Sequence, residues 1–411
     1  MGGTKKWMER QWEGGYNAPP NKKVCANCVV NEALADVVRQ SADGDQCDYC
    51  GKEVAAISMD VVIEHMADCI NEEFGDEDEE LPFDKETGRH LGAEAFDSEE
   101  LLDEIGFEGE GEFREDVVDV FSYRRWCRHD PFLLDPAERR KYGWENFKRV
   151  VQHQRRYTFW DKPDDVEERH PDDLPVGEML DEIADIVRDE NIFKILPPKS
   201  RFWRVRVGDN EFLCDRELSP PPEERANQAN RMSPPGISMF YGADDFDTAC
   251  IETLGNADDK KLVTGAKFVS VRELLVLDLV ELPRRPDFFE KGTSDTRYNL
   301  AFLHAFARDI AKPIDADGGQ HVKYVPTQAF TEYVRYRMKI DDKNIDGIRY
   351  KSSKNGKPCI VLFCGQDSCV EHPSQRRWLS FDGESRRTVS VAEIRKRQEE
   401  FEKMLKRIRS M

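Results

Sequence analysis

A group of polar side chains surrounds a Pro-Pro-Gly turn in the segment RMSPPGISMFYGADDFDTACIE, residues 231–252. Arg231 precedes Tyr241 by ten residues, and Glu252 follows that tyrosine by eleven residues. A buried structural strand would not need three polar groups spaced in this way. An arginine suits a phosphate, a tyrosine suits an aromatic ring, and a glutamate suits a positive charge. The pattern favours a site for a ligand that carries all three.

Two Cys-x2-Cys pairs stand near the N-terminus of a chain that has 11 cysteines. Cys25 and Cys28 form the first pair, and Cys47 and Cys50 form the second after a gap of 18 residues. Two pairs at about this separation complete a tetrahedral four-cysteine zinc site. Because no position is left for water, we expect the Zn²⁺ site to be closed and structural. A redox role is the alternative, although thioredoxin-type pairs occur singly and within a βαβ pattern.

Length and composition indicate a polar, multidomain protein. The 411 residues predict two or three domains, and 39% of them are hydrophobic against 35% charged. No apolar run is long enough to span a bilayer, and the N-terminus lacks the apolar core of a signal peptide, so we expect a cytoplasmic protein without a membrane partner. Most of the net charge of −21 comes from residues 71–120, where 21 Asp and Glu face three basic residues. This stretch is interpreted as a solvated acidic segment.

The first half of the chain is predicted to be mostly helical. Ser58 is a candidate N-cap, and apolar residues from Val62 to Phe74 follow it at helical spacing. Residues 135–138 read Asp-Pro-Ala-Glu, which is a cap, a first-turn proline and an acidic third residue, so a helix should begin there. Residues 114–128 have helical character, and residues 176–190 form an amphipathic helical pattern.

The pattern changes to mixed α+β after Leu196-Pro197-Pro198. Strand-like runs are separated by Gly and Pro turns at residues 202–207, 274–280 and 358–363, and a helical run occupies residues 301–311. We therefore predict three parts, which are a helical domain with a zinc knuckle, an α+β domain, and a linker with an amphipathic helix. Their ranges are 1–195, 196–370 and 371–411. In the last part, Ser390 and Glu393 suit a capping box, and Ile394, Phe401 and Ile408 recur every seven residues.

Several motifs of the second half occur in an order that resembles the RES family. They are Arg204 on the first strand, the segment 231–252, YVPTQAF at 324–330, and IDGIRYKSSKNGKPCIVLF at 345–363. The resemblance covers about residues 196–368, with an apparent insertion around 255–300. It implies an ADP-ribosyltransferase-like fold that consumes NAD⁺ as a substrate by hydrolysis or phosphorolysis of the nicotinamide–ribose bond. It also implies a toxin or anti-phage defence effector, with an antitoxin or immunity protein as a partner.

The resemblance gives each motif residue a role, and the side-chain chemistry agrees. Arg204 and Arg231 suit the pyrophosphate, and Tyr241 offers a flat face and a hydroxyl to the nicotinamide ring. Glu252 suits the cationic ribosyl centre that develops as nicotinamide departs, and it can orient the nucleophile. Ser352 can bind the carboxamide or a ribose hydroxyl.

Three neighbouring assignments stay open at this point. Ser353 stands beside Ser352, so the serine assignment can shift by one residue. Gln328 is a candidate NAD⁺-binding residue, although it can instead cap a helix, as Thr327 can. Asp244, Asp245 and Asp247 resemble the N-cap cluster of a helix and are not predicted to bind a metal.

The N-terminal half resembles the HEPN-associated domain that precedes some RES domains, and such domains are mostly regulatory. Arg124 and His129 fit the R-x4–6-H spacing of HEPN ribonucleases, although this short motif often arises by chance. Two alternatives to NAD⁺ degradation therefore stay open, a HEPN-type ribonuclease and a mono-ADP-ribosyltransferase that modifies a macromolecule. Nucleic acid is not an expected partner of the main hypothesis, and a homo-oligomer stays open.

Overall fold

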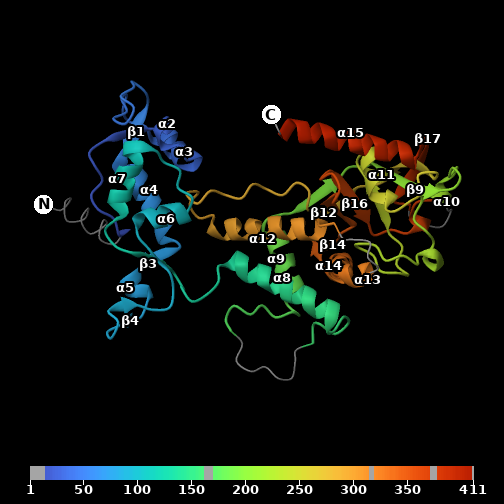
Figure 1. Cartoon of the computed structure of the whole chain (residues 1–411), viewed down its shortest axis with the longest axis horizontal. Helices are drawn as coiled ribbons and strands as arrows, with labels where there is room; N and C mark the ends of the chain where they lie inside the picture. Colours follow the sequence, from blue (N-terminus) through green and yellow to red (C-terminus); the bar gives the residue numbers. More distant parts are fainter. Residues whose placement is uncertain (1–13, 162–169, 314–318, 371–376, 410–411) are drawn as a thin grey trace. The chain divides into compact units, whose positions relative to one another are not determined.

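A computed structural model describes residues 14–161, 170–313, 319–370 and 377–409 of the chain (Figure 1). The chain divides into two compact units. Unit 1 comprises Met1–Glu138 and Arg284–Ala301, and unit 2 comprises Arg139–Pro283 and Phe302–Met411. The predicted domain boundary near residue 196 implies that residues 196–411 fold without the first half of the chain, and this stays a prediction. Within the described residues, no helix is both long enough and apolar enough to cross a membrane.

Unit 1 consists of short helices and small sheets. Its strands are β1 (Lys23–Cys25), β2 (Ala56–Ser58), β3 (Phe74–Asp76), β4 (Phe83–Asp84), β5 (Arg89–His90), β6 (Ala95–Phe96) and β7 (Trp126–Arg128). Its helices are α2 (Ala26–Val29), α3 (Glu32–Ser41), α4 (Met59–Asn71), α5 (Glu77–Glu80), α6 (Ser98–Glu104) and α7 (Gly111–Phe121). The acidic stretch is therefore ordered in part, and Asp97 begins α6 with a capping box to Glu100.

The sequence prediction for unit 1 is right about α4 and wrong about two neighbouring segments. Ser58 occupies the N-cap position of α4, although its side chain bonds to Asp60 and not to a backbone N–H, and Val62 and Met66 are buried as expected. Phe74, however, lies in strand β3. The helix predicted over residues 114–128 ends at Phe121, and Trp126–Arg128 form strand β7 between β3 and β6.

The early end of α7 has a structural cause. The indole Nε1 of Trp126 donates a hydrogen bond to the carbonyl of Phe121 at 3.0 Å, which satisfies one of the last free carbonyls of the helix. Trp126 itself is fully buried, and its backbone pairs with Asp76 of β3 and Phe96 of β6. Strand pairing across a long sequence separation therefore overrides the helical pattern of this segment.

Part of the insertion in the second half packs into the core of unit 1. Phe289 is 1% exposed and lies in one hydrophobic cluster with helix α4. His65 of α4 bonds through Nε2 to the Phe289 carbonyl at 2.8 Å, and Lys291 pairs with Asp68 at 2.5 Å. The buried guanidinium of Arg297 forms an ion pair with Glu73. Residues 284–301 thus complete the fold of the N-terminal unit.

We predict that Phe289→Ala lowers the free energy of unfolding of unit 1 by about 3–5 kcal/mol, because it removes a buried aromatic ring and leaves a cavity. Denaturant unfolding of the full-length chain measures this change, with limited proteolysis of unit 1 at each denaturant concentration as the readout. Phe83→Ala is the matched control, since the Phe83 side chain is 56% exposed. Equal unfolding midpoints for the two variants would contradict the packing of residue 289.

Unit 2 is built on a mixed sheet. In the described residues its sheet has eight strands in the order β17-β11-β9-β10-β16-β15-β12-β8. The bounds are β8 (Phe193–Leu196), β9 (Arg201–Gly208), β10 (Phe240–Ala243), β11 (Leu262–Ser270), β12 (Leu274–Asp278), β15 (Gly347–Lys351), β16 (Pro358–Leu362) and β17 (Leu379–Ser390). Only β12 and β15 pair in parallel among these neighbours. A separate hairpin joins β13 (Lys339–Ile340) and β14 (Lys343–Asn344).

The helices of unit 2 include the four that the sequence predicts, near residues 135, 176–190, 301–311 and 390. The helices are α8 (Pro136–His153), α9 (Met179–Asp189), α10 (Asp215–Leu218), α11 (Phe246–Leu254), α13 (Gln320–Lys323), α14 (Val325–Tyr336) and α15 (Val391–Arg409), and α12 (Ser294–Ala311) begins in the segment assigned to unit 1. The Glu138 N–H donates to Oδ1 of Asp135 at 2.9 Å, which confirms the predicted start of α8. Mixed helices and sheet confirm the α+β class.

The C-terminal part adds a strand as well as a helix. Residues 379–390 form β17, the edge strand that pairs with β11, in the part for which the sequence predicts a linker. The N–H of Glu393 donates to Oγ of Ser390 at 3.2 Å, as expected for a helix cap. Ile394 is 1% exposed, which places it in the core. The side chains of Phe401 and Ile408 lie outside the described residues.

Candidate active site

A cavity of about 1060 Å³ opens in unit 2 beside strands β9 and β10 and helix α11. Four of the predicted residues line it, and they come from different elements: Arg204 from β9, Arg231 from the loop before β10, Tyr241 from β10 and Glu252 from α11. Ser353 lines the cavity, whereas the buried Ser352 is not among its lining residues and Gln328 contacts the loop that carries Arg231. The structure therefore brings the predicted residues of three separate motifs together.

The lining of the cavity is strongly cationic. Six basic side chains contribute to it, namely Arg204, Arg206, Arg225, Arg231, Lys261 and Lys354, and Glu252 is the one carboxylate among its described lining residues. None of these six cations forms an ion pair with a described residue, although the chain has 82 acidic residues against 61 basic ones. Unpaired cations in a concave surface favour an anionic ligand.

Arg204 is held in place by backbone carbonyls. Its Nε donates to the carbonyl of Leu218 and its Nη1 to the carbonyl of Tyr241, both at 2.9 Å. The guanidinium also lies 5.5 Å from the centre of the Phe240 ring. Burial lowers the pKa of Arg204 to about 10, so the side chain stays charged at neutral pH. Two of its three nitrogens are therefore held by backbone carbonyls.

The loop that carries Arg231 is fastened to two helices. Arg231 donates from Nη1 to the carbonyl of Ile310 in the last turn of α12 at 2.5 Å. Oγ1 of Thr327 in α14 donates to the carbonyl of Arg231, and Nε2 of Gln328 donates to the carbonyl of Asn230 at 2.8 Å. Thr327 and Gln328 thus have a positioning role that the sequence motif did not reveal, and direct contact of Gln328 with a ligand stays a prediction.

Tyr241 presents a neutral phenol to the cavity. Its hydroxyl shares a hydrogen bond of 2.9 Å with Oγ of Ser233, a residue of the Pro-Pro-Gly turn. Burial raises the pKa of Tyr241 to about 12, although the hydrogen bond to Ser233 lowers it in part. The hydroxyl therefore keeps its proton at physiological pH and can donate it to a ligand.

Glu252 and Ser352 meet across the cavity wall. The hydroxyl of Ser352 donates to Oε1 of Glu252. The same oxygen of Ser352 accepts the backbone N–H groups of Lys354 at 3.1 Å and Asn355 at 3.4 Å. Ser352 is 4% exposed, whereas Glu252 is exposed to the cavity. Ser352, rather than Ser353, is therefore the serine that orients the carboxylate.

Sequence reasoning did not find four of the basic lining residues, Arg206, Arg225, Lys261 and Lys354. Two of them had a usable signal, because Arg206 and Lys354 each stand two residues after a predicted site residue. Arg225 ends a short 3-10 helix before β10 and Lys261 directly precedes β11, where no motif marks them. Only the folded chain shows that these two side chains share the cavity.

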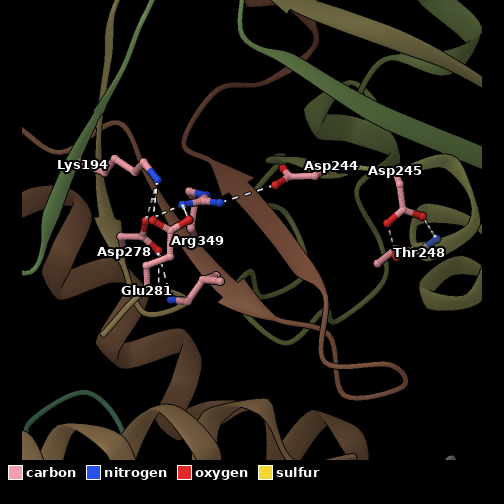
Figure 2. Close-up of polar contacts among 8 residues, drawn as sticks. Lys194, Asp244, Asp245, Thr248, Asp278, Glu281 and Arg349 are labelled. Atoms are coloured by element: carbon pink, nitrogen blue, oxygen red, sulfur yellow. Dashed lines mark hydrogen bonds and ion pairs between the residues drawn. The ribbon is translucent and has the colours of Figure 1, made fainter. Parts of the chain in front are cut away.

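The aspartates near α11 are structural, as the sequence predicts. Asp245 caps the helix by accepting the backbone N–H of Thr248 at 2.8 Å. Asp244 pairs with the buried Arg349 at 3.4 Å, and Arg349 also pairs with the buried Asp278 (Figure 2). Burial raises the pKa of Asp244, and the Arg349 guanidinium opposes that shift. Among the described residues, none of these carboxylates belongs to a cluster with metal-binding geometry.

The four cysteines of the N-terminal pairs converge on one point. Their sulfur atoms all lie within 4.8 Å of one another, with 3.7 Å between Cys25 and Cys28 and 3.9 Å between Cys25 and Cys50. Gly51 has φ of 66°, which suits the tight turn after the second pair. Burial opposes ionisation of Cys47, yet backbone N–H donors lower the pKa of its thiol to about 7. This cluster can hold a metal ion.

Arg124 and His129 flank strand β7, and each has structural partners. The guanidinium of Arg124 lies 4.2 Å from the centre of the Trp126 ring and donates to Oδ1 of Asn71 at 2.8 Å. His129 contacts Glu80 at 2.6 Å and the carbonyl of Asn71 at 3.2 Å. Burial lowers the pKa of Arg124, while nearby acidic groups oppose that shift. Both residues therefore have structural contacts, and ribonuclease activity at this pair stays a prediction.

Comparison with known families agrees with this architecture. A family model described as RES domain matches residues 201–382, and one described as HEPN/RES N-terminal domain 1 matches residues 40–165. The chain therefore carries a RES domain preceded by a HEPN/RES N-terminal domain, as its motifs predicted. No curated protein and no solved structure matches the chain. The cavity lies within the residues matched by the RES model.

Proposed function

We propose that the RES domain binds NAD⁺ in the cationic cavity and cleaves the bond between nicotinamide and ribose. A RES domain implies an enzyme that acts on NAD⁺ and a function of toxin type. The observation that carries the proposal is the combination of one carboxylate with six cations that form no ion pair with a described residue. NAD⁺ has the complementary charges, since its two phosphates are anionic and its nicotinamide ring is cationic.

In this proposal the arginines bind the anionic half of NAD⁺. Arg204 and Arg231 present planar guanidinium groups whose remaining N–H donors suit the pyrophosphate oxygens. The ring of Tyr241 offers a face to nicotinamide, and its protonated hydroxyl can donate to the carboxamide. NAD⁺ would therefore be bound by the side chains of Arg204, Arg231 and Tyr241, the second of which lies in the loop before β10.

The carboxylate of Glu252 acts on the cationic half. As the C–N bond breaks, its electron pair passes to the nicotinamide nitrogen and positive charge develops on the ribose. Glu252 stabilises that charge, and Ser352 fixes the carboxylate by donating a hydrogen bond to it. An oxygen of water or phosphate then forms the new bond to the ribose carbon. By depleting NAD⁺ in this reaction, the protein would act as a toxin or defence effector.

The N-terminal unit is assigned a regulatory role in this proposal. Its four-cysteine cluster would hold one structural Zn²⁺, because four thiolates leave no coordination position for a substrate. An antitoxin or immunity protein is the partner that a toxin of this kind requires. The antitoxin follows from the RES domain, whereas the zinc ion follows from the cysteine cluster and is tested separately.

Incubation of the purified chain with NAD⁺, with and without phosphate, tests the reaction. Mass spectrometry should detect nicotinamide together with ADP-ribose when water is the acceptor, or with phosphorylated ADP-ribose when phosphate is the acceptor. Addition of ADP-ribose to a protein would instead support the mono-ADP-ribosyltransferase. Intact NAD⁺ in every reaction, with a sample shown to be folded by circular dichroism, would overturn the proposal.

Arg231→Ala is predicted to weaken NAD⁺ binding by about 10–100-fold, because charge-assisted hydrogen bonds contribute about 1.5–3 kcal/mol. A clamp on the pyrophosphate holds the ground state and the transition state alike, so KM should rise more than kcat falls. Calorimetric titration with NAD⁺ measures the affinity. Arg308→Ala, an exposed arginine of α12, is the control and should bind normally. Unchanged affinity in Arg231→Ala would exclude this residue from the phosphate site.

A further inference from the structure

A second contact joins helix α11 to the loop of residues 352–357, one helical turn before Glu252. Thr248 and Glu252 are four residues apart on α11, so they lie on the same face of the helix. Nδ2 of Asn355 donates to Oγ1 of Thr248 at 2.9 Å, just as Ser352 donates to Glu252. The loop therefore contacts the helix at two successive turns.

The side chains of Thr248 and Asn355, which form this second contact, each have further hydrogen-bond partners. Thr248 is 0% exposed, and its hydroxyl donates to Oδ2 of Asp245 at 2.8 Å while it accepts from Asn355. Oδ1 of Asn355 accepts the N–H of Lys357 at 3.1 Å, and the N–H of Asn355 points to Oγ of Ser352 at 3.4 Å. Asn355 thus links the serine that orients Glu252 to the helix that carries Glu252.

An ion-pair network also links the start of α11 to strands β12 and β15. Arg349 stands three residues before Ser352, and it pairs with Asp278 at the end of β12 and with Asp244 next to the α11 cap (Figure 2). Lys194 and Glu281 extend the network at 2.7 Å from each other. The start of α11 and the strand that leads to Ser352 are therefore tied together before the loop begins.

We propose that Asn355 and Thr248 form a positioning pair that places Glu252 against the ribosyl centre of NAD⁺. The proposal rests on the proposed function of Glu252. The Glu252 side chain is exposed, and within the described residues a hydrogen bond from Ser352 holds its carboxylate. The position of that serine relative to α11 depends on the loop, and the Asn355–Thr248 hydrogen bond joins the loop to the first turn of the helix, next to an ion pair of 3.3 Å between Lys357 and the N-cap residue Asp245. Small displacements of a catalytic carboxylate are costly to the rate.

The test compares Asn355→Ala and Thr248→Val with the parent enzyme and with Thr248→Ser. Both disruptive variants should lower kcat about tenfold and change the KM for NAD⁺ less than about twofold. Thr248→Ser keeps the hydroxyl and should retain activity near that of the parent. Asn344→Ala, an exposed asparagine of β14, is the matched control. Thermal unfolding of each variant verifies that it is folded.

A double-mutant cycle separates positioning from general support of the fold. In a Glu252→Gln background, Asn355→Ala should have no further effect on the residual rate, since the carboxylate through which it acts is absent. An equal loss in both backgrounds, or an unchanged kcat in Asn355→Ala and Thr248→Val, would overturn the pair alone. Parent-like turnover by Glu252→Gln itself would overturn the proposed function of Glu252 and the pair with it.

Discussion

Glu252→Gln is expected to lower the turnover of NAD⁺ by about 10²–10³ and to leave the affinity for NAD⁺ little changed. Glutamine keeps the shape of the side chain and can still accept the hydrogen bond from Ser352. What it lacks is the negative charge that faces the ribosyl cation, and the loss of one such preorganised group costs about 3–4 kcal/mol of transition-state stabilisation. Binding should persist, because Arg204, Arg231 and Tyr241 are unaltered.

Steady-state kinetics and calorimetric titration of the same samples measure the two effects. Glu332→Gln on α14 is the matched control, because this glutamate is exposed and does not line the cavity. Growth inhibition in a bacterial host should disappear with Glu252→Gln and persist with the control. Near-normal turnover in Glu252→Gln, together with loss of toxicity in Arg124→Ala, would favour the ribonuclease instead.

Replacement of Cys47 by serine is expected to abolish binding of one zinc ion and to unfold the N-terminal knuckle. Cys47 is buried, and its sulfur lies 3.8 Å from that of Cys28. Structural zinc contributes about 10–16 kcal/mol to the folding of zinc-finger peptides, so a knuckle of short strands and one-turn helices should depend on it. Chelation of the metal from the parent protein should have the same effect.

Metal analysis and thiol titration of the purified protein test this expectation. The parent should contain one zinc per chain, and Cys214→Ser should keep it, since Cys214 is exposed and remote in sequence from the knuckle. Less than about half an equivalent of zinc in the parent, with all four knuckle thiols freely titratable, would exclude the structural zinc site.

Features that depend on neighbouring residues could be predicted from the sequence. The Cys-x2-Cys spacing predicted the convergence of four sulfur atoms, and the cap at Asp135 predicted the start of α8. Ordered motifs around Arg204, Tyr241 and Glu252 predicted a RES domain, and these side chains line one cavity. Caps, turns and paired ligands are local interactions, so a few consecutive residues are enough to specify them.

Contacts between distant segments were decided by the tertiary structure alone. Trp126 belongs to a strand because β3 and β6 pair with it, although its own neighbours favour a helix. Phe289 completes a core that is otherwise formed by residues more than 160 positions earlier. Ser352 meets Glu252 across 100 residues, and Lys261 joins the cavity without any motif. A one-residue shift in a strand or loop changes such contacts entirely, and only the packed chain determines that register.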